Sequence, residues 1–154
     1  MDMSLFGLTI DARSVCIFER PVSKHEALDR LVDAIAVTGT VDDAEAFRRA
    51  VRERESVMST GIGSGVAIPH VRIDAINSAS VGVGISRDGI DFNTLDNKPV
   101  HIIVLFAMPS GSQKEYLGLL AQVMTTMKAP GFREKLGACA TPDEVVSLLN
   151  TPAV

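Results

Sequence analysis

The sequence contains only two cysteines among its 154 residues. Cys16 and Cys139 lie far apart and form no Cys-x-x-Cys pair, which argues against a disulfide framework and against a zinc site built on cysteine. A single cysteine within an apolar segment ordinarily behaves as a small hydrophobic side chain. We therefore expect neither a disulfide-stapled domain nor a cysteine-ligated metal.

Long apolar runs and blocks of like charge are also missing. No apolar stretch approaches the roughly 18 to 20 residues needed to cross a bilayer, and the first ten residues carry Asp2 where a signal peptide would carry a positive charge. The 15 basic and 19 acidic residues are scattered, giving a net charge of -4 and no basic stripe for nucleic acid. We expect a cytoplasmic protein that neither inserts into membranes nor binds nucleic acid.

The chain does contain enough apolar sequence for one hydrophobic core. Hydrophobic residues make up 46% of its 154 residues, a length typical of one domain. No internal repeat, low-complexity tract or linker divides it. We therefore expect a single domain over residues 1–154.

Strand and helix patterns are mixed along the chain. Apolar or alternating runs predict strands over 14–18, 66–68, 79–86 and 100–108, with a turn at Asp88-Gly89. The capping boxes Ser23/Glu26 and Asp42/Glu45 each predict the start of a helix, because helical periodicity follows them. Separate helices are predicted over 117–127 and 132–136, and a last one after Thr141. This order of elements points to a layered α/β domain.

A glycine-rich segment offers hydrogen-bond donors to an anion. Residues 59–65 read Ser-Thr-Gly-Ile-Gly-Ser-Gly, which predicts a loop with uncovered backbone N–H groups and several hydroxyls. In the helix predicted before it, the stripe formed by Phe47 and Val51 continues to Arg54, which should therefore point toward the protein. No Gly-Lys-Ser or Gly-Lys-Thr follows the loop, and its glycine spacing does not fit a dinucleotide fingerprint.

His70 ends the apolar run directly after Pro69, whose ring makes a stiff approach. An imidazole with an ordinary pKa of about 6.5 is often neutral near pH 7, so that one nitrogen can act as a nucleophile while the other is held by a hydrogen bond. The alternative is a packed, hydrogen-bonded histidine with no chemistry, and residue statistics alone favour it.

A family resemblance favours the nucleophilic interpretation of His70 over the packed one. The sequence closely resembles the active-site signature of the fructose, mannitol and nitrogen-regulatory (type 2) enzyme IIA family of the bacterial phosphotransferase system in Arg54-Glu55 followed by Ser59-Thr60-Gly61-Ile62-Gly63-x-Gly65-Val66-Ala67-Ile68-Pro69-His70. Supporting similarities cover almost the entire chain and lie in Gly89-Ile90-Asp91-Phe92, Pro99-Val100, Tyr116-Leu117-x-Leu119-Leu120-Ala121 and Phe132-Arg133-x-x-Leu136.

The resemblance implies a mixed β-sheet with helices packed on both faces and a phosphorylatable histidine. It implies that His70 accepts a phosphoryl group from the phosphocarrier HPr or its paralogue, with no metal or cofactor. Arg54 matches the family's active-site arginine and should neutralise the phosphoryl oxygens. Ser59, Thr60 and Gly61 match the phosphate-binding loop beside the phosphohistidine.

Tyr116 is a departure from the family pattern. Relay members commonly carry a second histidine there, and a phenol cannot replace its positive charge. Tyr116 is a candidate phosphate contact, or alternatively an amphipathic residue at the edge of the core.

Three functions remain open. The leading hypothesis is a nitrogen-regulatory phosphoryl carrier that acts on a partner protein. The alternatives are a sugar-transport enzyme IIA that feeds an enzyme IIB, and a binding module that keeps the fold without the chemistry. The intact pair of Arg54 and His70 argues against the last of these, whereas Tyr116 keeps it open.

Overall fold

The computed structural model describes residues 10–57, 59–111 and 113–150. Its strands are β1 (Val15–Phe18), β2 (Gly61–Gly63), β3 (Val66–Ala67), β4 (His70–Arg72), β5 (Ser80–Ile90) and β6 (Val100–Met108). A short 3-10 turn (Ala12–Ser14) precedes five helices, α1 (Lys24–Ala36), α2 (Ala44–Val57), α3 (Gln113–Lys128), α4 (Phe132–Gly137) and α5 (Pro142–Asn150).

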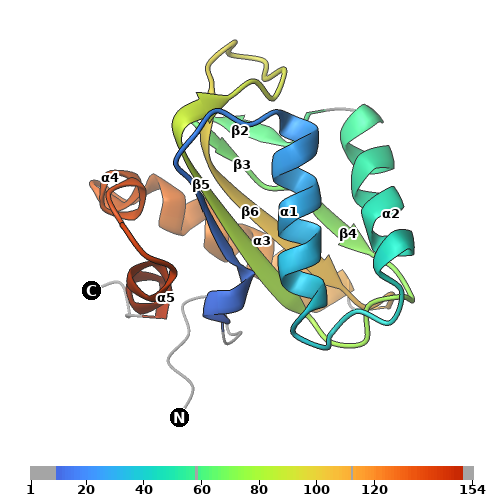
Figure 1. Cartoon of the computed structure of the whole chain (residues 1–154). Coiled ribbons are helices and arrows are strands. Elements are labelled where there is room, and N and C mark those ends of the chain that lie inside the picture. The colour runs from blue at the N-terminus through green and yellow to red at the C-terminus, as the bar shows by residue number, and fades with distance from the viewer. Residues whose placement is uncertain (1–9, 58, 112, 151–154) are drawn as a thin grey trace.

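The strands form one mixed sheet in the order β1-β5-β6-β3-β2, with β4 also paired to β6 (Figure 1). β6 runs antiparallel to β5 and parallel to β3 and β4, which follow one another along the same side of it. Helices α1 and α2 cover one face of the sheet, and α3, α4 and α5 cover the other. The expected fold class, a mixed sheet with helices on both faces, is confirmed.

The central strand β6 is buried on both faces, as its unbroken apolar sequence predicts. Ile102, Val104 and Phe106 pack in the core beneath α3, α4 and α5, whereas Ile103 and Leu105 pack in the core beneath α1 and α2. Because successive side chains of a strand point to opposite faces, this one segment serves both cores.

The glycine face of β5 lets α1 lie close to the sheet. A Cβ built on Gly82 would lie 2.9 Å from Cδ1 of Ile35, and one built on Gly84 would lie 3.2 Å from Cδ1 of Leu31. The lack of side-chain bulk on this face of β5 is therefore what admits the helix. The turn expected at Asp88-Gly89 is wrong, however, because β5 continues to Ile90 and absorbs these residues in a shift of register.

Two of the predicted helix caps are confirmed, and the third is wrong by one residue. Ser23 accepts a hydrogen bond from Glu26 N at 3.1 Å, and Thr141 accepts one from Glu144 N at 3.2 Å. The cap of α2 is Asp43, which accepts from Ala46 N at 3.1 Å, and not Asp42 as predicted. The side chain of Asp42 is used elsewhere, because its Oδ1 accepts a hydrogen bond from Asn77.

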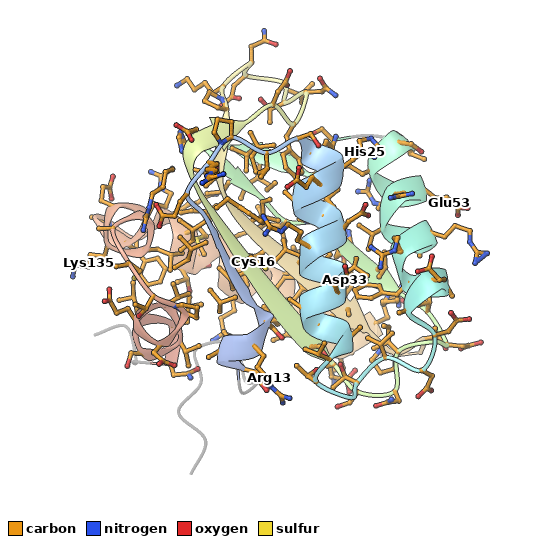
Figure 2. The ribbon with its side chains drawn as sticks, viewed as in Figure 1. Arg13, Cys16, His25, Asp33, Glu53 and Lys135 are labelled. Atoms are coloured by element: carbon orange, nitrogen blue, oxygen red, sulfur yellow. The ribbon has the colours of Figure 1, made fainter. Side chains whose placement is uncertain are left out.

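Ion pairs join α1 to α2. Asp33 points from α1 toward α2 (Figure 2), where its carboxylate accepts from Arg48. Asp29 on α1 accepts from Arg52 at 2.6 Å. Both helices are therefore held together above the sheet, which steadies the residues at the C-terminal end of α2.

The loop predicted over residues 59–65 is partly a β-hairpin. β2 pairs antiparallel with β3, and the two turn residues, Ser64 and Gly65, have φ values of 58° and 81°. Two consecutive positive φ values suit a tight hairpin turn, which explains the glycine there. The glycines of this segment therefore serve the geometry of the hairpin turn, in addition to leaving backbone N–H groups uncovered.

Within the ranges that the structure describes, no helix combines the length and the apolar character required to cross a membrane.

Candidate functional site

His70 begins β4 at the edge of the sheet, paired with Phe106 of β6. Its Nδ1 lies 2.9 Å from the carbonyl oxygen of Ile68. A carbonyl can only accept, so the proton resides on Nδ1 and the lone pair on Nε2. The peptide before Pro69 therefore orients the ring, and the nitrogen able to attack an electrophile is Nε2.

The surroundings of His70 favour the neutral ring. Partial burial lowers its pKa below 6.5, while the hydrogen bond to the Ile68 carbonyl opposes this effect. The positive charges of Arg54 and Arg72 lower the pKa further, and the negative charge of Glu55 raises it. The net direction is downward, which keeps the imidazole unprotonated and nucleophilic near pH 7.

A cavity of about 490 Å³ opens beside this ring and is lined by Arg54, His70, Arg72 and Tyr116 among others. The rings of His70 and Tyr116 have centroids 5.1 Å apart and are tilted by 41°. Two guanidinium groups and a neutral imidazole therefore share one open depression. Such a set can bind an anion and place it against a nucleophilic nitrogen.

Three elements bring these side chains together. Residues alternate along β4, so that Val71 packs beneath α1 and α2 while His70 and Arg72 project from the other side of the strand. Tyr116 comes from the first turns of α3, and Arg54 from the last turn of α2. The predicted continuation of the α2 stripe to Arg54 is confirmed, since Phe47 and Val51 are buried and Arg54 lines the cavity.

The predicted phosphate-binding loop uses several of its donors internally. Thr60 donates its backbone N–H and its hydroxyl to the carboxylate of Glu55, at 3.1 and 2.7 Å. Gly61 donates its N–H to the hydroxyl of Ser59 at 3.1 Å. The structure therefore brings Arg54, His70 and Tyr116 together around one cavity, whereas these donors of Thr60 and Gly61 hold the chain in place.

The sequence reasoning missed Glu55 and Lys24 as a buried pair. Lys24 Nζ lies 2.8 Å from Glu55 Oε1, and their side chains are 13% and 4% exposed. Lys24 also lies over the ring of Phe92, 5.0 Å from its centroid. Glu55 follows Val51 by four positions, so helical spacing already predicts that it lies on the buried side of α2. Its partner Lys24 lies on α1, and helical spacing cannot predict a contact between two helices.

Arg72 was also missed. Residues two apart in a strand share a face, and this rule could have placed Arg72 beside His70 once β4 was recognised. The strand was not predicted because only three residues form it.

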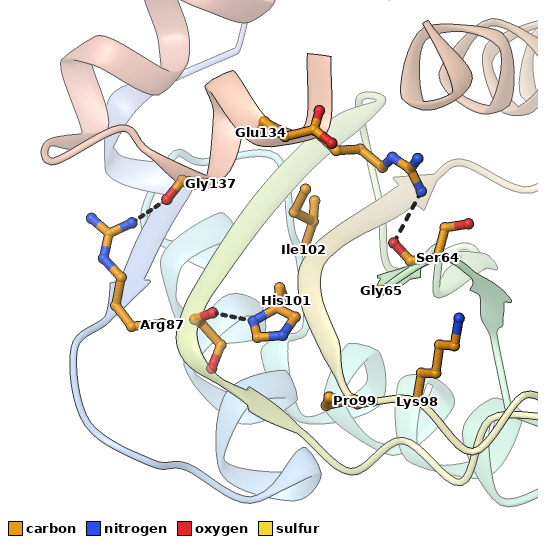
Figure 3. Close-up of a pocket in the computed structure, with 11 residues that line it drawn as sticks. Ser64, Gly65, Arg87, Lys98, Pro99, His101, Ile102, Glu134 and Gly137 are labelled. Atoms are coloured by element: carbon orange, nitrogen blue, oxygen red, sulfur yellow. Dashed lines mark hydrogen bonds between the residues drawn. The ribbon is translucent and has the colours of Figure 1, made fainter. Parts of the chain in front are cut away.

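A larger cavity, of about 650 Å³, lies at the other end of β6 (Figure 3). It contains His101, the second residue of β6, whereas His70 pairs with Phe106 near the opposite end. The ring of His101 is bonded through Nδ1 to the Ser86 carbonyl at 3.0 Å, as Figure 3 shows. His101 makes this hydrogen bond although the residue is exposed.

The arginines of this larger cavity are engaged in structural contacts. Arg87 pairs with Glu19 at 3.4 Å and donates to the carbonyl of Gly137. Arg133 donates to the carbonyl of Ser64 at 3.1 Å, which ties α4 to the hairpin turn. The ring of His101 is oriented through Nδ1 much as that of His70 is, but the two arginines near it are engaged in holding the fold together, so the cavity around His70 is the stronger candidate site.

The third histidine and the two cysteines are not among the residues that line either cavity. His25 is exposed in the first turn of α1 (Figure 2). Cys16 and Cys139 are both free thiols. Among the residues described by the structure, no group of three or more His, Cys, Asp or Glu side chains could hold a metal ion.

Comparisons with known proteins converge on one family. The sequence model described as "Phosphoenolpyruvate-dependent sugar phosphotransferase system, EIIA 2" matches residues 10–151. The fructose-specific EIIA component of Haloferax volcanii is 31% identical over 136 residues, which cover 88% of each protein. The fructose-specific EIIABC component of Bacillus subtilis is 30% identical over 127 residues, 82% of this chain but only 20% of that protein.

A solved structure with a regulatory name is also similar. The nitrogen regulatory protein IIA-Ntr from Neisseria meningitidis superposes with a TM-score of 0.84 at 25% identity, covering 95% of this chain and 99% of that one. Proteins named for sugar transport and for nitrogen regulation therefore both resemble this chain.

Proposed function

Because the chain belongs to the EIIA type-2 family of the phosphoenolpyruvate-dependent sugar phosphotransferase system, whose members are phosphotransfer proteins, we propose that Nε2 of His70 accepts a phosphoryl group from an HPr-like phosphocarrier. One observation carries the proposal. The bond from Nδ1 to the Ile68 carbonyl leaves the lone pair on Nε2, in a ring that borders a cavity shared with Arg54.

The transfer is a balanced exchange between two imidazoles. The lone pair of His70 Nε2 forms the new N–P bond as the N–P bond of the donor phosphohistidine breaks, and the electron pair of that bond returns to the donor nitrogen. The proton on Nδ1 stays in its bond to Ile68 throughout. Arg54 neutralises the charge on the three oxygens of the group in transit.

The residues of the predicted loop support the ring indirectly. Thr60 accepts a hydrogen bond from Ile68 N at 3.0 Å, and the carbonyl of Ile68 in turn orients His70. Ser59 and Gly61 shape the turn that precedes this connection. We propose that Ser59, Thr60 and Gly61 form the wall beside the phosphohistidine, with Tyr116 on the side of α3.

We propose that the carrier is of the nitrogen-regulatory kind, in which phosphorylation of His70 changes binding to a regulated partner. Tyr116 supports this assignment, because a phenol beside His70 cannot shuttle a proton or carry a positive charge as a second imidazole would. A phosphoryl group adds negative charge to an exposed, arginine-lined surface, and so alters its electrostatic complementarity to a partner.

A transport role is the second candidate. It is favoured by the identity of 31% to a fructose-specific component along almost its whole length. In that role the phosphohistidine would pass its group to an enzyme IIB.

The experiment is phosphorylation of the purified protein by phosphoenolpyruvate, enzyme I and HPr, followed by intact mass. We expect the mass of one phosphoryl group, labile in acid, in the wild type and in the matched control His25→Ala. His70→Ala should take up none. Labelling of His70→Ala, or no labelling of the wild type, would refute the assignment.

A chase with an enzyme IIB then separates the two roles. Rapid loss of label to the enzyme IIB indicates transport, whereas retained label together with phosphorylation-dependent partner binding indicates regulation. A partner interaction that is unchanged by His70→Ala would instead indicate a binding module.

A further inference from the structure

Arg72 lies two residues after His70 on β4 and lines the same cavity. Because residues two apart in a strand project from the same face, the two side chains leave the sheet together. Arg72 is exposed, and within the residues that the structure describes its guanidinium makes no ion pair. Its charge is therefore available to an incoming anion.

The ring of Tyr116 holds this guanidinium in place. The Cζ of Arg72 lies 5.3 Å from the centroid of the Tyr116 ring, an arrangement typical of a cation–π contact. The same ring lies 5.1 Å from His70. Tyr116 thus contacts both the nucleophile and a cation, although it comes from a different element than either.

We propose that Arg72 is a second phosphoryl-binding residue and that Tyr116 is the positioning residue that stacks it beside His70. This inference rests on the proposed phosphorylation of His70. Tyr116 carries no positive charge, and on this proposal Arg72 supplies one instead. The phosphoryl group in transit then meets two guanidinium ions, those of Arg54 and Arg72. Guanidinium groups suit this task because they are always charged and present several donors in one plane.

The arrangement assigns different effects to the two residues. Removal of Arg72 takes away a charge that contacts the phosphoryl oxygens, so transfer to His70 slows. Removal of the ring at Tyr116 leaves the charge on a mobile side chain, so transfer slows less. Without Arg72 the ring has no cation to position, and its removal should then have little further effect.

The test is the rate of phosphoryl transfer from phosphorylated HPr to the full chain carrying Arg72→Gln, Tyr116→Leu or both. We expect Arg72→Gln to slow transfer by about tenfold, less than the roughly 10²–10³ typical of a preorganised donor in a water-excluded site, because Arg72 is exposed. Tyr116→Leu should slow it by a smaller factor, and Tyr116→Phe, which keeps the ring, by less still. The double variant should match Arg72→Gln alone.

A matched control accounts for the general loss of positive charge. Arg49→Gln removes one exposed guanidinium from α2, outside the cavity, and should leave the rate within about twofold of the wild type. The pKa of His70, followed by NMR, should rise in Arg72→Gln because a neighbouring positive charge is lost. This rise would show that the guanidinium lies close to the imidazole, whereas the transfer rate reports whether it acts on the phosphoryl group.

Two results would overturn the inference: transfer at the wild-type rate in Arg72→Gln, or an equal slowing by Tyr116→Leu in the presence and absence of Arg72. Failure of the proposed function is distinguishable, because then the wild type itself would not be labelled.

Discussion

The buried carboxylate of Glu55 offers a quantitative test of how the site is held. Its two oxygens accept hydrogen bonds from Thr60 N at 3.1 Å and Thr60 Oγ1 at 2.7 Å, and Oε1 lies 2.8 Å from Lys24 Nζ. The side chain is only 4% exposed. Glu55→Ala therefore leaves the two donors of Thr60 without an acceptor, and it leaves the Lys24 ammonium without a counter-charge and with only the Phe92 carbonyl, at 3.4 Å, to accept from it.

The expected cost follows from this geometry. Breaking a buried ion pair by removal of one partner costs about 3–5 kcal/mol. For a domain of this size, about 1 kcal/mol corresponds to roughly 2–4 °C in Tm, so we expect Glu55→Ala to lower Tm by about 6–20 °C. Because Thr60 supports Ile68, and Ile68 orients the ring of His70, the rate of phosphorylation should fall as well.

Thermal and urea unfolding followed by circular dichroism measure the loss, with Glu53→Ala as the control. Glu53 is an exposed acid on the same helix (Figure 2), and its replacement should change the free energy of unfolding by no more than about 0.5 kcal/mol. Lys24→Met combined with Glu55→Gln should be more stable than Glu55→Gln alone, since it removes the unpaired cation. A Tm of Glu55→Ala within about 2 °C of the wild type would refute the reasoning.

Three further predictions concern other contacts. The pKa of His70 is lowered on folding, chiefly by burial, so stability should fall as pH drops from about 6.5 through the lower folded-state value; urea unfolding at pH 7.5 and 5 should show a smaller pH effect in His70→Gln. Gly61→Ala should destabilise, because its Cβ would overlap Cγ2 of Thr94; Thr94→Ser, which removes that methyl group, should restore part of the loss, and no restoration would contradict the clash. Arg87→Ala should cost about 1–3 kcal/mol in urea unfolding, because the Gly137 carbonyl at the end of α4 loses its donor; an unchanged unfolding midpoint would contradict that role.

Much of the fold could be predicted from local pattern. The glycine face of β5, the apolar run of β6 and the caps Ser23 and Thr141 are short-range signals, and the structure bears them out. The errors arose where two local signals competed. Asp42 and Asp43 both suit a helix cap, and the choice between them was made by Asn77, which binds Asp42 from a distant segment.

The sequence by itself singled out His70 and Arg54 as candidates, His70 through the resemblance of its motif to a known family and Arg54 also through the inward stripe of its helix. Only the tertiary structure decided that Thr60 is bonded to Glu55, that Lys24 completes this pair, and that Arg72 stacks on Tyr116. These contacts join residues from different elements. They depend on how the sheet and its two helical layers are packed, and short-range periodicity carries no information on that packing.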